Sequence, residues 1–269
     1  MKKFSLHFIG LCCLSLLLIS NLAFSKAPTG VLQEAIERGT LRVGVSSFVP
    51  WAMQDKSGKY IGFEIDVAKR LAKDFGIKLE ILPTRWSGII PALLTGKFDM
   101  IICGLSSTPA RSLRVNFSIP YDYVVIEAIG HKDKLGNIDD FEKFNNKETI
   151  VSVRTGTTAA IAAKLTLPKA TIRYFDEEAS ALQEMLNKRS HMFFTSGPLG
   201  TFEVLKDPDN LRHAAEKDIY PQPISIAVRK GDFDTLNAIN AWIRNLDAEG
   251  WLEEKHSYWF ETKDWEKLL

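Results

Sequence analysis

Residues 104–121, GLSSTPARSLRVNFSIPY, follow directly on the apolar run MIIC at 100–103. The apolar run predicts a buried strand. The small hydroxyl residues and the proline at 106–109 end that strand and predict the start of a helix. A strand that ends this way presents free backbone N–H groups and the positive end of a helix dipole at one point.

Arg111 follows this turn closely and carries a planar fork of donors that suits a carboxylate. Together with the hydroxyls of Ser106 and Thr108, it predicts a pocket for a small anion. The alternative is an ordinary capped turn with an arginine on the surface. The residues of this stretch leave both interpretations open.

The order G-x-S-x-T-P-x-R, followed by V-x-F-S-x-P-Y, resembles the signature of the bacterial extracellular solute-binding proteins of family 3, which serve polar amino-acid ABC transporters. The resemblance covers essentially the whole chain after its first residues. Further matches in order and spacing are FVPW at 48–51, GFEIDVA at 62–68, WSGIIPAL at 86–93, GKFD at 96–99 and VRTGTT at 153–158.

Helical and strand patterns alternate along the chain, which predicts an α/β fold with parallel sheets covered by helices. Helices are predicted at 31–38, 63–75, 89–94, 158–165, 178–187 and 233–246. Strands are predicted at 41–45, 77–82, 99–103, 124–132, 149–153, 171–175, 192–195 and 223–229.

The order of these elements indicates one domain inserted into another. We expect residues 27–124 and 224–269 to form lobe 1 and residues 125–223 to form lobe 2. The resemblance implies the two-lobed periplasmic-binding-protein fold of type II. Each lobe would then be a mostly parallel sheet flanked by helices, with two hinge strands between the lobes and a cleft that closes over the ligand.

The first 25 residues have the pattern of a cleavable signal peptide. Two lysines precede an apolar stretch at 8–19, and Ala23-Phe24-Ser25 is a small-x-small cleavage signal. The apolar stretch is short for a membrane span. We therefore expect an exported protein, located in the periplasm, and a monomer.

Removal of this segment leaves 32 basic and 33 acidic side chains, a formal charge of −1. Such a balance argues against nucleic acid or a membrane surface as partner. Two of the three cysteines also leave, and the remaining Cys103 lies in an apolar strand, where a buried inert thiol is expected.

The resemblance assigns roles to residues of lobe 1. It implies that Arg111 pairs with the ligand carboxylate, assisted by Ser106 and Thr108, with Gly104 beside them. Phe48 and Trp86 match the aromatic walls that enclose the ligand side chain. The alternative for both aromatic residues is a place in the core. We expect Arg114 to be solvated and Trp51 to pack in the interior.

In lobe 2, the resemblance implies that the turn at 153–158 faces the ligand, through its backbone and through Arg154 or Thr158. Family members that bind α-amino acids usually carry an Asp where this chain has Ser196. A serine can accept a hydrogen bond but cannot balance a buried ammonium. Either the amine is differently placed or absent, or another acid supplies the charge. The acids considered are Glu64, Asp122, Glu127, Asp176 and Glu203.

Other chemistry finds little support in the sequence. The histidines have no partner at metal-ligand spacing, and no phosphate-binding or dinucleotide motif is present. We expect no cofactor and no metal.

The prediction is a non-enzymatic protein that captures a small carboxylate-bearing solute, foremost an amino acid, and delivers it to an ABC permease. The rival is a cyclohexadienyl dehydratase, which in this family eliminates carboxylate and water from prephenate or arogenate in the same cleft. That chemistry needs a positioned general acid, and a cleft carboxyl with a raised pKa would favour it. A sensor or murein-lyase module would require a membrane span or a further domain.

Overall fold

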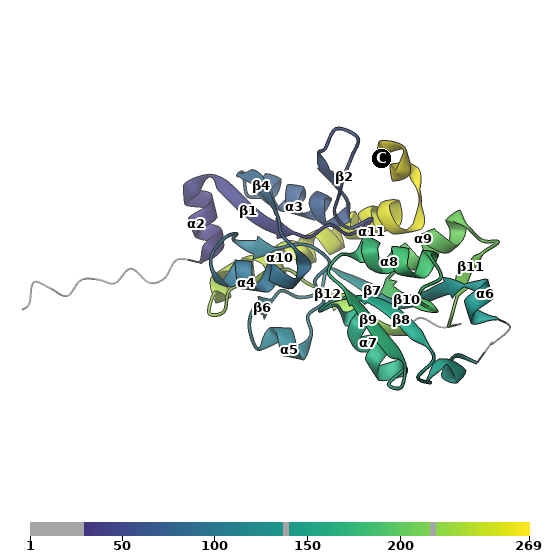
Figure 1. The fold of residues 1–269 in the computed structure, drawn as a ribbon. Helices are drawn as coiled ribbons and strands as arrows, with labels where there is room; N and C mark the ends of the chain where they lie inside the picture. Colours follow the sequence, from purple (N-terminus) through teal and green to yellow (C-terminus); the bar gives the residue numbers. More distant parts are fainter. Residues whose placement is uncertain (1–29, 137–139, 216–218) are drawn as a thin grey trace, which may run out of the picture.

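The computed structural model describes residues 30–136, 140–215 and 219–269. The predicted signal peptide at 1–25 lies outside these described residues. Within them the chain forms two α/β lobes, each built on its own sheet with helices packed against it (Figure 1). This arrangement confirms the predicted two-lobed fold class.

The first sheet has the strand order β4-β1-β5-β13-β6. Its strands are β1 (Thr40–Val45), β4 (Lys78–Pro83), β5 (Met100–Ile101), β6 (Asn116–Phe117) and β13 (Ala227–Val228). Strand β1 runs parallel to β4 and β5, whereas β13 is antiparallel to β5 and β6. A separate hairpin pairs β2 (Met53–Gln54) with β3 (Tyr60–Ile61).

The helices of this lobe come from both ends of the chain. They are α2 (Val31–Arg38), α3 (Phe63–Asp74), η1 (Trp86–Gly88), α4 (Ile89–Leu94), α5 (Pro109–Ser112), α10 (Phe233–Ala248), α11 (Trp251–His256), η3 (Ser257–Glu261) and η4 (Asp264–Leu268). Helix α3 shows why they form, because Phe63, Val67 and Leu71 recur at spacing four and are fully buried.

The second sheet has the order β11-β7-β10-β8-β9, and β12 also pairs with β7. Its strands are β7 (Asp122–His131), β8 (Ile150–Arg154), β9 (Thr171–Phe175), β10 (Met192–Ser196), β11 (Leu211–His213) and β12 (Ile219–Ile224). The helices are α6 (Lys132–Leu135), η2 (Phe141–Phe144), α7 (Thr158–Thr166), α8 (Glu178–Leu186) and α9 (Leu199–Lys206).

Both sheets are mixed and not mostly parallel as the resemblance implied, and their antiparallel pairs involve the strands near the crossings between lobes. Strand β7 is antiparallel to β10, β11 and β12, while β8 is parallel to β9 and β10. Strands β7 and β12 pair directly, with Val124 opposite Gln222 and Asp122 opposite Ile224. The lobe boundaries at 124/125 and 223/224 fall within these two strands and stay a prediction.

Most predicted elements appear within one or two residues of their expected bounds, but the single strand expected at 223–229 is wrong. The chain there ends β12 at Ile224 and starts β13 only at Ala227. Ser225 and Ile226 instead bond to Leu105 and Ser118 of the first lobe. The segment divides because its two ends pair with different sheets.

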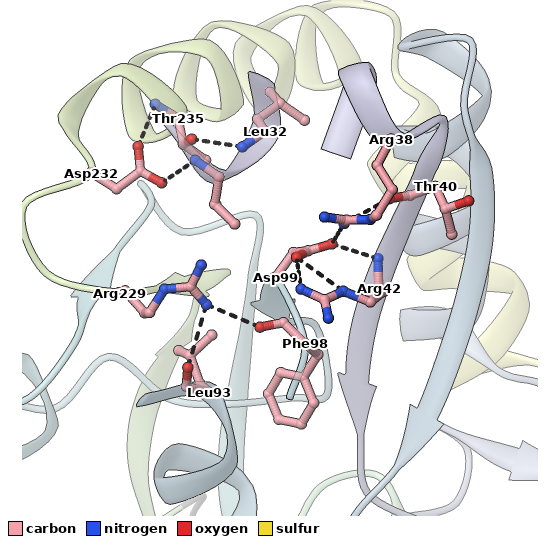
Figure 2. Close-up of polar contacts among 11 residues, drawn as sticks. Leu32, Arg38, Thr40, Arg42, Leu93, Phe98, Asp99, Arg229, Asp232 and Thr235 are labelled. Carbon is pink, nitrogen blue, oxygen red and sulfur yellow. Dashed lines mark hydrogen bonds and ion pairs between the residues drawn. The ribbon is translucent and has the colours of Figure 1, made fainter. Parts of the chain in front are cut away.

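A buried carboxylate holds the first lobe together at the edge away from the second lobe. Asp99 is fully buried and accepts two hydrogen bonds from the Arg42 side chain, at 2.7 and 3.2 Å, and one from the Arg42 backbone N–H at 2.8 Å. Arg38 adds a fourth at 2.5 Å, and Figure 2 shows both guanidinium groups converging on Asp99. This cluster fixes the start of β1 against β5.

The C-terminal segment packs on the first lobe. Trp265 is 2% exposed, and its indole N–H bonds to the backbone carbonyls of Trp259 and Thr262. The Trp265 ring also lies 5.8 Å from the ring of Phe202 on α9. Trp51 is buried, as predicted, and so is Cys103.

Candidate functional site

A cavity of about 370 Å³, counted with its opening to solvent, lies where the two lobes meet. Residues from both lobes form its wall: Phe48, Trp86, Gly104, Ser106, Arg154, Thr157, Thr158, Ala159, Glu178 and Ser196. Seven of the nine predicted site residues are therefore brought together here, and the other two, Thr108 and Arg111, lie beside this wall. We call this space the cleft cavity.

The turn of the first lobe places its backbone against the cavity. Gly104 has φ of 67°, a conformation that favours glycine, and a Cβ there would lie 3.2 Å from the Trp51 ring. Thr108 caps α5, because its hydroxyl accepts the backbone N–H of Arg111 at 3.3 Å. The hydroxyl of Thr108 thus serves the turn, and its predicted contact with ligand stays a prediction.

Arg111 lies between the lobes with its guanidinium turned to backbone carbonyls. It donates to Ser106 O at 2.9 Å and, across the cleft, to Gly156 O at 3.0 Å. Among the described residues no carboxylate forms an ion pair with Arg111. Burial without a compensating anion lowers the pKa of Arg111 to about 10. A carboxylate arriving here would meet a desolvated and uncompensated cation.

Trp86 connects the two arginines of the cleft. The guanidinium carbons of Arg111 and Arg154 lie 5.4 and 5.5 Å from the centre of the Trp86 ring, within the range of a cation–π contact. The Trp86 indole N–H also donates to Gly156 O at 3.2 Å. Trp86 is partly buried and packs against the hydrophobic core of the first lobe. It therefore both lines the cavity and belongs in part to the core.

Arg154 reaches from the second lobe into the first. Its guanidinium donates to Ser46 Oγ at 3.0 Å and to Ser47 O at 3.3 Å, and its Nε donates to Asp176 O at 3.2 Å. The residue is only 2% exposed. Arg154 therefore lines the cavity and at the same time bonds the lobes to each other.

The second turn of the cavity begins α7. Thr157 caps this helix by accepting the Ala160 N–H at 3.1 Å, and Thr158 is buried in the cavity wall. The capping hydroxyl itself donates to Arg154 O at 2.8 Å. The turn thus carries its polar groups toward the same space as Ser106, from the opposite lobe.

Glu178, like Thr157 and Ala159, lines the cavity but is not among the nine predicted site residues. It starts α8, three positions after β9 ends at Phe175, and its Oε1 accepts a hydrogen bond from Thr195 Oγ1 at 2.6 Å. Part of the residue meets solvent, but protein surrounds its carboxyl. This desolvation raises the pKa of Glu178 to about 7, despite the opposing effects of Thr195 and the charge of Arg154. A cleft carboxyl with a raised pKa is thus present.

Ser196 and Glu178 line the same cavity, and Thr195, next to Ser196, holds the Glu178 carboxyl. An acid therefore stands near the position where the resemblance leads one to expect Asp. The signal in the sequence was its location, since side chains just after parallel strands gather at one edge of a sheet. Asp176, two residues earlier, is among the acids considered from the sequence, but Glu178 is not.

None of the five acids considered from the sequence lines the cleft cavity. Each is engaged elsewhere: Glu64 with Tyr121 at 2.6 Å, Asp122 with His256 at 2.9 Å, Glu127 with Thr201 at 2.6 Å, Glu203 with Lys206 at 2.8 Å, and Asp176 through its backbone carbonyl with Arg154 at 3.2 Å. The side chains of Glu64, Asp122, Glu127 and Glu203 are thus paired within the protein, whereas the Asp176 side chain is exposed. Arg114 is exposed, as expected.

Residues 41–262 match the model of the bacterial extracellular solute-binding proteins, family 3. The chain belongs to this family. A curated relative is the L-cystine-binding protein TcyJ of Escherichia coli (strain K12), 27% identical over 88% of each chain. Another is the cyclohexadienyl dehydratase of Pseudomonas aeruginosa, 24% identical over 98% of this chain and 97% of the relative.

The crystal structure of the ancestral amino acid-binding protein AncCDT-1, a precursor of cyclohexadienyl dehydratase, is also similar. It is 39% identical, with a TM-score of 0.78, over 86% of this chain and all of that one. Proteins named for binding and a protein named for catalysis are thus both similar to this chain. The ancestral binding protein shares the fold described above.

Two further features bear on what this family member does. No helix among the described residues is long and apolar enough to cross a membrane. In the same part of the chain, the acidic, cysteine and histidine side chains form no group of three suited to a metal ion.

Proposed function

We propose that this chain captures a small carboxylate-bearing solute, foremost an α-amino acid, in the cleft cavity and delivers it to an ABC permease. The observation that carries the proposal is the state of Arg111. A half-buried cation without a carboxylate partner in the described residues carries a desolvation cost, and an anionic ligand would offset that cost. The names of the binding relatives support an amino acid as that ligand.

In this proposal Arg111 binds the ligand carboxylate. It exchanges its bonds to Ser106 O and Gly156 O for a bidentate pair with the ligand. Such charge-assisted bonds contribute about 1.5–3 kcal/mol each. Trp86, stacked beside the guanidinium, and Phe48 would enclose the rest of the ligand.

Glu178 is the proposed partner of the ligand ammonium, in place of the Asp that this chain lacks at Ser196. An ammonium in the cavity favours the charged carboxylate, so binding would lower the pKa of Glu178 below its raised value near 7. Amino-acid binding then releases a proton wherever the free protein holds one on Glu178.

Hinge closure belongs to the proposal. Ser46 and Ser47 of the first lobe bond Arg154, and Trp86 and Arg111 bond Gly156 of the second. These bonds span the cleft beside the cavity and would open if the lobes separated about β7 and β12. A ligand that contacts both lobes would then favour the closed state.

A second candidate function, the dehydratase, is supported by the same carboxyl. With a pKa near 7, Glu178 holds a proton in part of the molecules at neutral pH, as a general acid must. It would give that proton to the hydroxyl that leaves prephenate or arogenate as water, while the carboxylate leaves as carbon dioxide. The binding proposal needs the charged form of Glu178, and the enzyme proposal needs the protonated form.

The test is a thermal-shift screen of the mature protein, unfolded and refolded to remove bound ligand. The panel contains the proteinogenic amino acids, D-amino acids, amines and organic acids including prephenate. We expect an amino acid to raise the melting temperature of the wild type by mass action. Arg111→Ala should lose that response, with affinity at least about 100-fold weaker, while the exposed Arg114→Ala serves as the matched control.

Two results would contradict the binding proposal. One is an Arg111→Ala protein that binds the amino acid as well as Arg114→Ala does. The other is silence from every amino acid together with turnover of prephenate or arogenate, which would establish the enzyme instead.

A further inference from the structure

Phe202 of the second lobe is buried in the core of the first. It lies on α9, is 4% exposed, and belongs to the large hydrophobic cluster of the first lobe. The other buried members of that cluster lie at 35–124 and 224–265. The ring therefore joins the two lobes at a point outside the strands β7 and β12, which cross between them.

The C-terminal segment, residues 257–269, supplies this contact. The ring of Trp265 lies 5.8 Å from that of Phe202, and Lys263 Nζ lies 5.3 Å from the centre of the Phe202 ring, within the range of a cation–π contact. Figure 1 shows the C-terminal segment, in yellow, beside α9. Phe202 and Trp265 thus shield each other from water.

Helix α9 is fixed to the second lobe. Thr201, next to Phe202, donates to Glu127 of β7 from its backbone N–H at 3.0 Å and from its hydroxyl at 2.6 Å. Glu127 is 8% exposed, so these bonds are largely shielded from water. Phe202 therefore follows the second lobe when that lobe moves.

The C-terminal segment is fixed to the first lobe. The Trp259 indole N–H donates to Asp66 of α3 at 3.0 Å, and Leu268 O accepts the backbone N–H of Lys56 at 3.1 Å. The Trp265 indole N–H in turn donates to Trp259 O at 3.0 Å. Trp265 therefore stays with the first lobe when the lobes separate.

A second apolar contact between the lobes continues toward the cleft cavity. Phe48 and Val49 of the first lobe pack against the second-lobe cluster that contains Leu199. Leu199 precedes Phe202 by three positions on α9, and Phe48 lines the cleft cavity. The apolar contact surface thus extends from the C-terminal segment to the cavity wall.

Opening the cleft would expose these apolar surfaces to water, so their burial favours the closed arrangement whether or not a ligand is present. We propose that Phe202, enclosed by Trp265 and Lys263, is a latch that keeps the ligand-free protein predominantly closed. The inference goes beyond the proposed function, from which it takes hinge closure about β7 and β12.

Such a latch affects affinity and association rate in opposite ways. Because the closed state is already the populated one, affinity is not reduced by a small binding-competent fraction. Association is slower, because a ligand enters only while the latch is open.

The experiment is small-angle X-ray scattering on the mature protein, unfolded and refolded to remove bound ligand. Wild type should have the radius of gyration of the closed structure. Phe202→Ala removes the latch ring and should lower the closed-to-open ratio by about 10-fold or more, so the radius of gyration should increase. Phe202→Leu keeps a large apolar side chain and should stay close to wild type.

Phe144→Ala is the matched control. Phe144 is also 4% exposed and lies in the second lobe, but it packs within the core of that lobe. The same truncation should therefore lower stability without changing the radius of gyration.

Equal radii of gyration in Phe202→Ala and wild type would overturn the inference, as would an equal increase in Phe144→Ala. A wild-type radius above that of the closed structure would also overturn it, and this measurement needs no variant. None of these results involves a ligand. If the latch fails while an amino acid raises the melting temperature, the proposed function stands; if no amino acid does so, the proposed function fails whatever the scattering shows.

Discussion

Asp99 and Glu178 are carboxylates enclosed by the protein, one in each lobe, and their surroundings differ sharply. Asp99 accepts four hydrogen bonds from Arg38 and Arg42 at the edge of the first lobe (Figure 2). Glu178 accepts one, from Thr195, and faces a cavity. A carboxylate whose bonds are all taken belongs to the fold, whereas one left with a single neutral donor is available to a ligand.

The arginines repeat the contrast. Hydrogen bonding to Asp99 raises the pKa of Arg42, while burial lowers the pKa of Arg111 to about 10. Arg42 forms an ion pair with Asp99, whereas Arg111 forms none with a carboxylate among the described residues. At the outer edge of the first lobe, the arginines and Asp99 thus form ion pairs with each other. At the cleft, Arg111 and Glu178 have no ion-pair partner among the described residues.

Replacing Asp99 should have the largest effect on stability. Asp99→Asn removes a fully buried partner from two arginines that are themselves 38% and 30% exposed, so the loss should lie between that of a surface pair and that of a buried pair, about 2 kcal/mol. Denaturant unfolding measures this loss. Ligand affinity of the folded protein should not change, because Asp99 lies outside the cleft cavity.

A stability loss below about 1 kcal/mol in Asp99→Asn would show that the ion pairs of Asp99 with Arg38 and Arg42 contribute little to stability. Asp99 could then no longer be contrasted with Glu178 as a carboxylate that stabilises the fold. The exposed Lys188–Asp133 pair offers a control, since Asp133→Asn should cost far less than Asp99→Asn.

Glu64 is the intermediate case, buried with one bond from the Tyr121 hydroxyl and no place in the cavity. Burial raises the pKa of Glu64 from 4.5 to about 8. Between these values the folded chain keeps a proton that the unfolded chain has released, so stability falls as pH rises. The fall is at most about 1.4 kcal/mol per pH unit for this group.

Glu64→Gln should remove that part of the pH dependence while Tyr121 keeps an acceptor. The free energy of unfolding, measured by denaturant from about pH 5 to about pH 8, should therefore fall less steeply in the variant than in wild type. Parallel curves would mean that Glu64 is ionised in the folded protein.

The features that could be predicted from the sequence differ in kind from those that could not. Three features were predictable because each rests on local pattern and family spacing. They are the strand that ends before the turn at 104–111, the cavity wall of Phe48 and Trp86, and the two-lobed fold. Glu178 was missed because the chain contains many acids, and the one available to a ligand is the one whose carboxyl keeps few hydrogen-bond partners after folding. That outcome is set by partners distant in sequence, such as Thr195, and no local pattern contains it.

The division of residues 223–229 between two strands was missed for a related reason. The segment PISIAVR alternates like one strand, but its ends pair with β7 and with β5 and β6. Competition between two sheets for one segment is a tertiary effect. Local alternation cannot reveal it.

Ser196→Asp should have the smallest effect. Because Glu178 already supplies an acid to the same cavity, the gain in amino-acid affinity over wild type should be below about 3-fold by calorimetry. In a Glu178→Gln background the same change should recover much of the lost affinity. A large gain in the wild-type background would mean that Glu178 does not serve as the amine partner.

The most direct test of the account is the affinity of wild type for its amino acid between about pH 5.5 and about pH 7.5, where the ligand's own charges stay constant. Since the charged form of Glu178 binds the ammonium and its pKa in the free protein is about 7, affinity should rise through this range. Glu178→Gln should bind at least about 10-fold more weakly, without that rise. An affinity that is flat in wild type, or equal in the variant, would contradict the assignment of Glu178 as the amine partner.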